Sequence, residues 1–282
     1  MLRILAPTDF STDGYNATLV AMQLARALTA EVVFVHAMAK PPVPAASPES
    51  LFRSVYSEEM RKTQVRLLDE AQHLLDILDL RHAEVRYKTL VVPTPFADAM
   101  LQVIASENID LVVMGSRGSS QLKQILIGSN TLELMRLSPV PLLVIPSYDV
   151  FDGFDNITIL LEQMKLPERA GIEMLDSIAQ TYNAMLHFLI LTKDGQQVQD
   201  VSELQDQHSS WQHVLTRPHT TNLLADSEAP TGMRAHMAAT NSSLVVLMPE
   251  KLSIWEILFS KNLSEELAVR AHMPLLILPH KV

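Results

Sequence analysis

Residues 111 to 130 read LVVMGSRGSSQLKQILIGSN, and this stretch decides the fold. A short apolar strand, Leu111 to Met114, runs into Gly115 and Gly118, and a nine-residue arm then leads to Gly128, Ser129 and Asn130, which open a helix. Three of the chain's 8 glycines fall between positions 115 and 128. Such clustering at the end of a strand indicates that the connection needs residues without a side chain.

When a glycine-containing loop connects a strand to the N-terminus of a helix, several main-chain N–H groups can point at one anion, most often a phosphate. Ser129 is expected as the N-cap, whose hydroxyl can satisfy a helix donor or turn to a phosphate oxygen. The alternative is a plain strand-turn-helix connection whose glycines fit positive φ. Residue types alone leave these two interpretations equally favoured.

The full spacing favours the anion site. Gly-x2-Gly-x9-Gly followed by Ser resembles the nucleotide-binding signature of the universal stress protein family, and APTDFS at 6 to 11 resembles the ending of that family's first strand. The resemblance implies adenosine contacts from Thr8 and Asp9, an adenine contact from the backbone of Ala37, and ribose contacts from Met114 and Gly115. It assigns the phosphates to Gly118, Gly128, Ser129 and Asn130, with added charge from Arg117. From the residues alone, Asp9 equally well caps the next helix, and an exposed loop arginine is the favoured interpretation of Arg117.

Composition narrows the class of protein. The chain has 282 residues, of which 48% are apolar, and it has no cysteine, so disulfides and thiolate metal sites are excluded. No apolar run reaches the ~20 residues of a membrane span, and the N-terminus turns polar too early for a signal peptide. We therefore expect a cytoplasmic protein without a membrane partner.

Charge and histidine placement exclude further classes. The first 150 residues carry 13 Lys and Arg against 16 Asp and Glu, and the remainder carries 9 against 16, which gives −3 and −7 and sums to the net charge of −10. Neither half offers a basic face for nucleic acid. The ten histidines form no ligand motif, and His36 and His187, in or beside apolar strands, are expected to be structural. No metal site is predicted.

Strand and helix patterns alternate along the first half. Strands are predicted at 2–6, 31–37, 83–92, 111–114 and 141–146 from continuous apolar runs, which a parallel sheet covered on both faces requires. Helices are predicted between them, the longest from Glu58 to Leu80 with Val65, Leu68, Leu75 and Leu78 as its apolar face. The order predicts an α/β fold, Rossmann-like, with a five-stranded parallel sheet wound with helices on both faces.

The sequence of the second half resembles a degenerate repeat of the first half. An offset of 133 residues sets 112–130 over 245–263, and sets PLLVIP (141–146) over PLLILP (274–279). The chain is therefore expected to form two tandem domains, 1–148 and 149–282, the second shortened in the region of the long helix. Its site is expected to be inactive, because Met248, Lys251 and Lys261 replace the three glycines and Glu162 replaces Asp9. Single-domain members of the universal stress protein family pair through their fifth strands, so the resemblance implies that the two PLL segments pair antiparallel within this chain and make it an intramolecular pseudo-dimer; a homodimer is allowed but not required.

Binding is favoured over turnover. The chain has neither a GxxxxGK[ST] loop nor a GxSxG elbow, and no catalytic residue can be named. Three hypotheses follow. The first is a stress-response protein that binds ATP or another adenine nucleotide, with or without Mg²⁺, and so alters the surface offered to an unknown protein partner. The second is a partner-binding scaffold without nucleotide, and the third is a slow ATPase or kinase-like enzyme.

Overall fold

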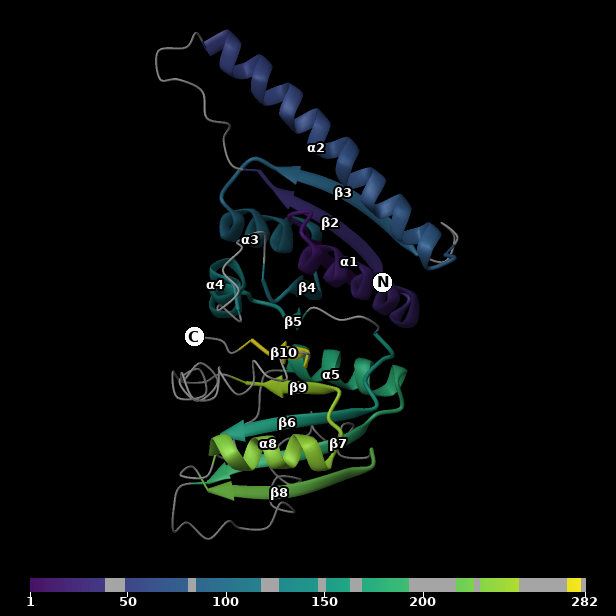
Figure 1. Cartoon of the computed structure of the whole chain (residues 1–282), viewed down its shortest axis with the longest axis vertical. Coiled ribbons are helices and arrows are strands. Elements are labelled where there is room, and N and C mark those ends of the chain that lie inside the picture. The colour runs from purple at the N-terminus through teal and green to yellow at the C-terminus, as the bar shows by residue number, and fades with distance from the viewer. Residues whose placement is uncertain are drawn as a thin grey trace. The chain divides into compact units, whose positions relative to one another are not determined.

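Strands and helices alternate in the described part of the first repeat, from β1 to β5. The computed structural model describes residues 1–38, 49–80, 85–117, 127–146, 151–162, 169–192, 217–225, 229–248 and 273–279. The chain divides into two units, Met1–Ser138 and Pro139–Val282. Each unit has a mostly parallel sheet flanked by helices (Figure 1), which confirms the Rossmann-like α/β fold class.

The first unit is built on four parallel strands in the order β3-β2-β1-β4. Their bounds are Arg3–Pro7 for β1, Glu31–Ala37 for β2, Arg86–Val92 for β3 and Leu111–Gly115 for β4. Ile4 pairs with Val32 on one side and with Leu111 on the other, so β1 lies between β2 and β4. The four predicted strands are confirmed. β4 is buried along its whole length, as its continuous apolar sequence requires.

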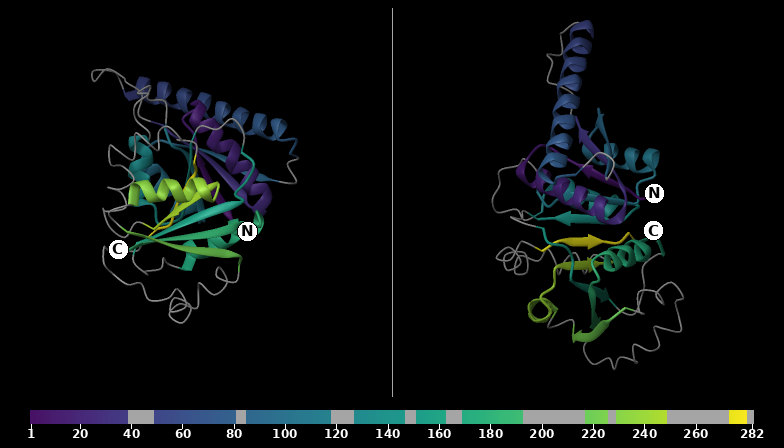
Figure 2. Two further views of the ribbon diagram at one scale, coloured as in Figure 1. Left: turned by 60° about the horizontal axis from the view of Figure 1, so that its bottom comes forward. Right: turned by 90° about the vertical axis from the view of Figure 1, so that its right-hand side faces the viewer.

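Four helices cover the two faces of this sheet. They are α1 (Thr12–Leu28), α2 (Glu49–Ile77), α3 (Phe96–Glu107) and α4 (Ser129–Leu137). α1 and α2 pack on one face and α3 on the other (Figure 2), and α4 packs beside α3. Right-handed crossovers produce this division, because the chain steps in one direction through β1, β2 and β3 and then returns past β1 to β4.

The buried face of α2 differs from the prediction. Val65 is 48% exposed and Leu68 is 39% exposed, so placing these two side chains in the core was wrong. The buried side chains are those of Leu67, Ala71, Leu74 and Leu75. Both sets recur at helical intervals, and only packing on β2 and β3 selects between two neighbouring apolar stripes.

The second unit has the strand order β5-β10-β9-β6-β7-β8. Its strands are β5 (Leu142–Ile145), β6 (Asn156–Glu162), β7 (Met185–Thr192), β8 (His219–Ala225), β9 (Leu244–Leu247) and β10 (Leu275–Ile277). Its described helices are α5 (Arg169–Thr181) and α8 (Ala229–Ala239). The order β8-β7-β6-β9 matches β3-β2-β1-β4 of the first unit.

β5 and β10 pair antiparallel, with Leu143 opposite Leu276, as predicted for the two PLL segments. The boundary between the two units falls before β5, so the fifth strand of the first sequence repeat lies in the second unit. The region where the second repeat is shortened, 193–216, lies outside the described residues. No helix in the described ranges is long and apolar enough to cross a membrane.

Candidate functional site

The carboxyl ends of β1, β2 and β4 are neighbours and form what we call the carboxyl edge of the first unit. Thr8, directly after β1, donates its N–H to the carbonyl of Val35 at 2.9 Å. The carbonyl of Thr8 accepts a hydrogen bond from His36 Nδ1 at 2.8 Å. Ala37 is the last residue of β2. The structure therefore brings the predicted residues Thr8, Asp9 and Ala37 to one place.

Asp9 is exposed at this edge and anchors the start of α1. Its Oδ1 accepts from the N–H of Ser11 at 3.0 Å and also from the Ser11 hydroxyl. Ser11 is the N-cap of α1, and its Oγ accepts from the N–H of Gly14 at 3.1 Å. The interpretation of Asp9 as the helix cap is thus wrong, because Asp9 positions the residue that caps the helix.

Gly115 permits a close approach between main chains. A Cβ at this position would lie 2.8 Å from the carbonyl oxygen of Asp13 and 3.2 Å from that of Arg117. Among the described glycines only Gly153 has a positive φ, so the interpretation that the glycines of the motif fit positive φ is wrong for Gly115 and Gly128. Gly115 is required because α1 passes directly over the end of β4.

The N-terminus of α4 lies at the same edge. Its N-cap is Gly128, with φ −69° and ψ 156°, and not Ser129 as predicted; Ser129 is the first helical residue. The N–H of Gly128 is used internally, on the carbonyl of Ser116 at 2.8 Å. Ser129 and Asn130 are exposed, and within the described ranges no acceptor contacts their main-chain amides. These amides and the helix dipole favour an anion.

The α4 N-terminus is fixed to the end of β4 by a buried hydrogen bond. The hydroxyl of Thr131, which is 2% exposed, donates to the carbonyl of Gly115 at 3.0 Å. Met114 precedes Gly115 at the end of β4 and is buried. Gly118 and the arm to residue 126 lie outside the described residues.

Arg117 forms an ion pair across the edge. Its Nε lies 3.0 Å from Oδ2 of Asp13, in the first turn of α1. The Arg117 side chain is 36% exposed. Arg117 therefore forms a partly buried ion pair and is not the exposed loop arginine that the sequence favoured. Asp13 is not among the residues that the sequence analysis placed at this site. No local pattern links it to Arg117, because the two residues are 104 positions apart.

Helix α2 adds two residues that the sequence did not single out. Arg66 lies over the Phe10 ring, with its guanidinium carbon 3.9 Å from the ring centroid. Phe10, at φ 62°, also stacks on His36 with centroids 4.8 Å apart. Glu70, further along the same helix, accepts a hydrogen bond from the hydroxyl of Thr18 on α1 at 3.3 Å. One helix packed on a face of the sheet thus reaches the carboxyl edge.

The equivalent position in the second unit carries side chains. Met248 directly follows β9, where the first unit has glycine, and it is 7% exposed. Glu162, which replaces Asp9, ends β6. Lys251 and Lys261 lie outside the described residues.

Histidines have structural partners in both units. His187 is 7% exposed, with Nδ1 2.8 Å from the hydroxyl of Thr220 and Nε2 3.3 Å from Oδ1 of Asn156. His36 is held by Thr8 and Phe10, as described above. Both contacts are those of structural histidines, as predicted. Within the described ranges, no three His, Cys, Asp or Glu side chains gather as metal ligands would.

The fold and the carboxyl edge define a Rossmann-like α/β protein with a helix N-terminus beside its central strands. Residues 1–146 match the Universal stress protein family, and the chain belongs to that family. Universal stress protein MJ0577 of Methanocaldococcus jannaschii is 26% identical over 152 residues, which cover 51% of this chain and 93% of that protein.

Solved structures extend the fold comparison. A universal stress protein from Archaeoglobus fulgidus is 16% identical, with a TM-score of 0.67 over 99% of this chain and 96% of that chain. The fold is therefore shared along the whole length. A universal stress protein solved in complex with cAMP is 19% identical and covers 52% of this chain and 98% of that chain, with a TM-score of 0.37. At that similarity, its ligand is a property of that protein alone.

Proposed function

We propose that this protein binds an adenine nucleotide, ATP in the first instance, at the carboxyl edge and acts as a regulator in the stress response. One observation carries the proposal. The ends of β1, β2 and β4 and the N-terminus of α4 gather at one edge, and all of them lie within residues 1–146, which match the family. In open α/β sheets, ligands bind beyond the carboxyl ends of the strands.

The residues at this edge suit the parts of a nucleotide. Thr8, Asp9 and Ala37 would hold the adenosine, and Met114 and Gly115 would face the ribose. The phosphates would lie at the amides of Ser129 and Asn130, beside Gly128; Gly118, which the resemblance also assigns to the phosphates, lies outside the described residues. Asp13 would repel them, but Arg117 compensates its charge at 3.0 Å. Any Mg²⁺ would arrive with the nucleotide.

The role we propose is binding, with the nucleotide altering the surface that a partner protein meets. The scaffold alternative, with no nucleotide at all, draws on Met248, whose buried side chain stands where the second unit would need bare backbone. The two functions differ in one measurable property, the affinity of the whole chain for ATP.

Titration calorimetry with ATP tests the proposal on the full chain. The wild type should bind, and Gly128→Val should bind at least tenfold more weakly, because its side chain would enter the space of the phosphates. The φ and ψ of Gly128 lie in the β region, which valine favours, so the backbone itself is not strained. Gly128→Ala, with a smaller side chain at the same backbone angles, should fall between the two.

Two results would contradict the proposal. Unchanged ATP affinity in Gly128→Val, with circular dichroism showing a folded protein, would remove the phosphates from α4. Absence of binding by the wild type at millimolar ATP would leave the scaffold function. Multiple-turnover phosphate release that is lost in Asp9→Asn would instead favour an enzyme.

A further inference from the structure

Phe10, directly after Asp9 at the carboxyl edge, has an unfavourable backbone conformation. Its φ of 62° lies in the left-handed region, which bulky side chains rarely adopt. The other described non-glycine residues with positive φ lie one or two positions beyond the end of a helix, where this conformation is an ordinary cap: Thr29, Asp79, Asn108, Asn183 and Asn241. Phe10 instead lies between a strand and the start of a helix. Contacts with other parts of the first unit must therefore hold it there.

Two side chains from other elements contact the Phe10 ring. The imidazole of His36, in β2, stacks on it with ring centroids 4.8 Å apart and planes inclined by 28°. The guanidinium carbon of Arg66, in α2, lies 3.9 Å from the ring centroid, which is a cation–π contact. Arg66 is exposed, and among the described residues no acceptor lies within hydrogen-bond distance of its guanidinium. We call these three side chains the His36–Phe10–Arg66 stack.

The stack is joined to the residues proposed to hold the adenosine. His36 Nδ1 contacts the carbonyl of Thr8 at 2.8 Å, and the N–H of Phe10 donates to Oγ1 of Thr8 at 3.0 Å. Asp9 lies between Thr8 and Phe10, and its Oδ1 accepts from the N–H of Ser11 at 3.0 Å. A rotation of the Phe10 backbone out of the left-handed region would therefore displace Asp9, because these bonds tie the loop together.

We propose that the His36–Phe10–Arg66 stack is a clamp that holds the loop of residues 8–11 in its ATP-binding conformation, which makes Phe10 and Arg66 positioning residues for the adenosine. The inference rests on the proposed function, because it concerns the same carboxyl edge. The left-handed φ of Phe10 opposes this conformation, and the two ring contacts stabilise it. Without these contacts a smaller fraction of the protein has the binding conformation, and the apparent affinity falls with that fraction.

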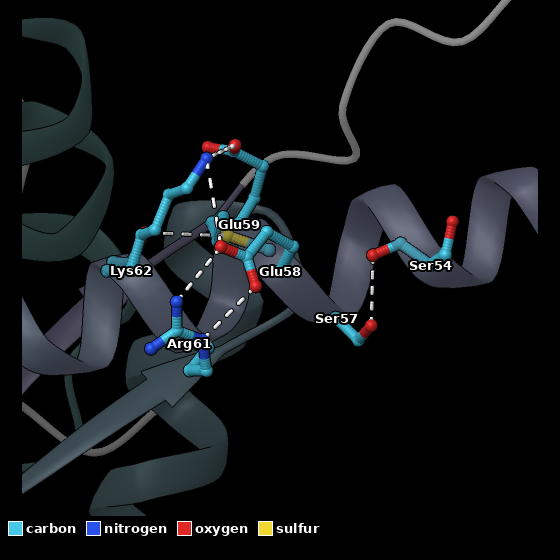
Figure 3. A network of polar contacts seen from close by, with 8 residues as sticks. Ser54, Ser57, Glu58, Glu59, Arg61 and Lys62 are labelled. Carbon is cyan, nitrogen blue, oxygen red and sulfur yellow. Dashed lines mark hydrogen bonds and ion pairs between the residues drawn. The ribbon is translucent and has the colours of Figure 1, made fainter.

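The first test replaces Arg66, whose exposed side chain can change without disturbing the core. Titration calorimetry of the full chain measures the affinities for ATP and AMP, which share the adenosine and differ in their number of phosphates. Arg66→Gln should weaken both by the same factor, about two- to fivefold, the size of one exposed cation–π contact. The matched control is Arg61→Gln on the same helix, which loses the same charge. Arg61 binds Glu58 at 3.0 and 3.1 Å (Figure 3), so this variant should leave both affinities unchanged.

The second test separates the backbone strain from the ring contacts. Phe10→Gly and Phe10→Ala both remove the ring, but only glycine adopts a positive φ without strain. Phe10→Ala should therefore bind ATP and AMP about fivefold more weakly than Phe10→Gly, and both variants should bind more weakly than the wild type. Circular dichroism verifies that each variant is folded.

The outcomes separate the clamp from nucleotide binding itself. Unchanged affinities in Arg66→Gln, or equal affinities of Phe10→Gly and Phe10→Ala, would overturn the clamp and leave nucleotide binding intact. A larger loss for ATP than for AMP in Arg66→Gln would also overturn it, because Arg66 would then act on the phosphates. Failure of the wild type to bind either nucleotide would overturn both this inference and the proposed function.

Discussion

Gly115→Ala should destabilise the first unit, whereas Gly128→Ala in the same motif should not. The Cβ that alanine adds at position 115 would lie 2.8 Å from the carbonyl oxygen and 2.9 Å from the carbonyl carbon of Asp13. Both are main-chain atoms at the start of α1, and they cannot rotate aside as a flexible side chain would. The N-terminus of α1 must therefore move away from β4.

The expected cost is about 1–3 kcal/mol, the range for overpacking a well-packed interior. At Gly128 the backbone is extended, so alanine adds no strain and restricts the unfolded chain by about 0.4–1 kcal/mol. Alanine is a poorer N-cap than glycine by a comparable amount. The two effects at Gly128 oppose each other, and the net change should stay within about 0.5 kcal/mol.

Urea unfolding followed by circular dichroism measures both variants against the wild type. Both tryptophans, Trp211 and Trp255, belong to the second half of the sequence, so fluorescence does not monitor the first unit. Hydrogen exchange of peptides from β1 and β4 assigns the loss to that unit. Equal stability of Gly115→Ala and Gly128→Ala would refute the reasoning, because it would show that the Asp13 main chain yields freely.

Three further predictions concern single contacts. Thr131→Val should cost about 1–3 kcal/mol in urea unfolding, because it leaves a buried main-chain carbonyl at the end of β4 without its donor; a change under about 0.5 kcal/mol would contradict this. Asp13→Asn should alter stability by less than about 1 kcal/mol, since its ion pair with Arg117 is partly exposed, yet it should tighten ATP binding because it removes a negative charge beside the proposed phosphates; weaker binding would contradict it. Burial lowers the pKa of His187 and of His236, and His187 lowers that of His236 further. The stability tied to these neutral rings is complete above the unfolded histidine pKa of about 6.5 and is lost as the pH falls through the lower folded values. Because Nε2 of His236 is buried and has no partner within the described ranges, His236→Leu should reduce this acid loss in urea midpoints measured across pH, and an unchanged slope would refute the assignment.

The sequence alone determined the elements and their order. Continuous apolar runs placed β1, β2, β3 and β4 to within three residues, and the glycine spacing located the α4 N-terminus at the end of β4. The family resemblance, together with the repeated PLL segments, implied the antiparallel pair of β5 and β10. These features are local or repeated patterns in the sequence. Such patterns are sufficient to predict strands and turns, because backbone geometry depends mainly on neighbouring residues.

Only the tertiary structure decided which groups meet. The ion pair of Arg117 with Asp13 joins residues 104 positions apart, and the contact of Thr18 with Glu70 spans 52. No local pattern records such pairs, because crossovers in a doubly wound sheet bring distant segments to the same edge. For the same reason the sequence could not separate Gly115, which makes room for α1, from Gly128, which opens α4. It also could not choose the buried stripe of α2, because both stripes have helical spacing and only the sheet beneath selects one.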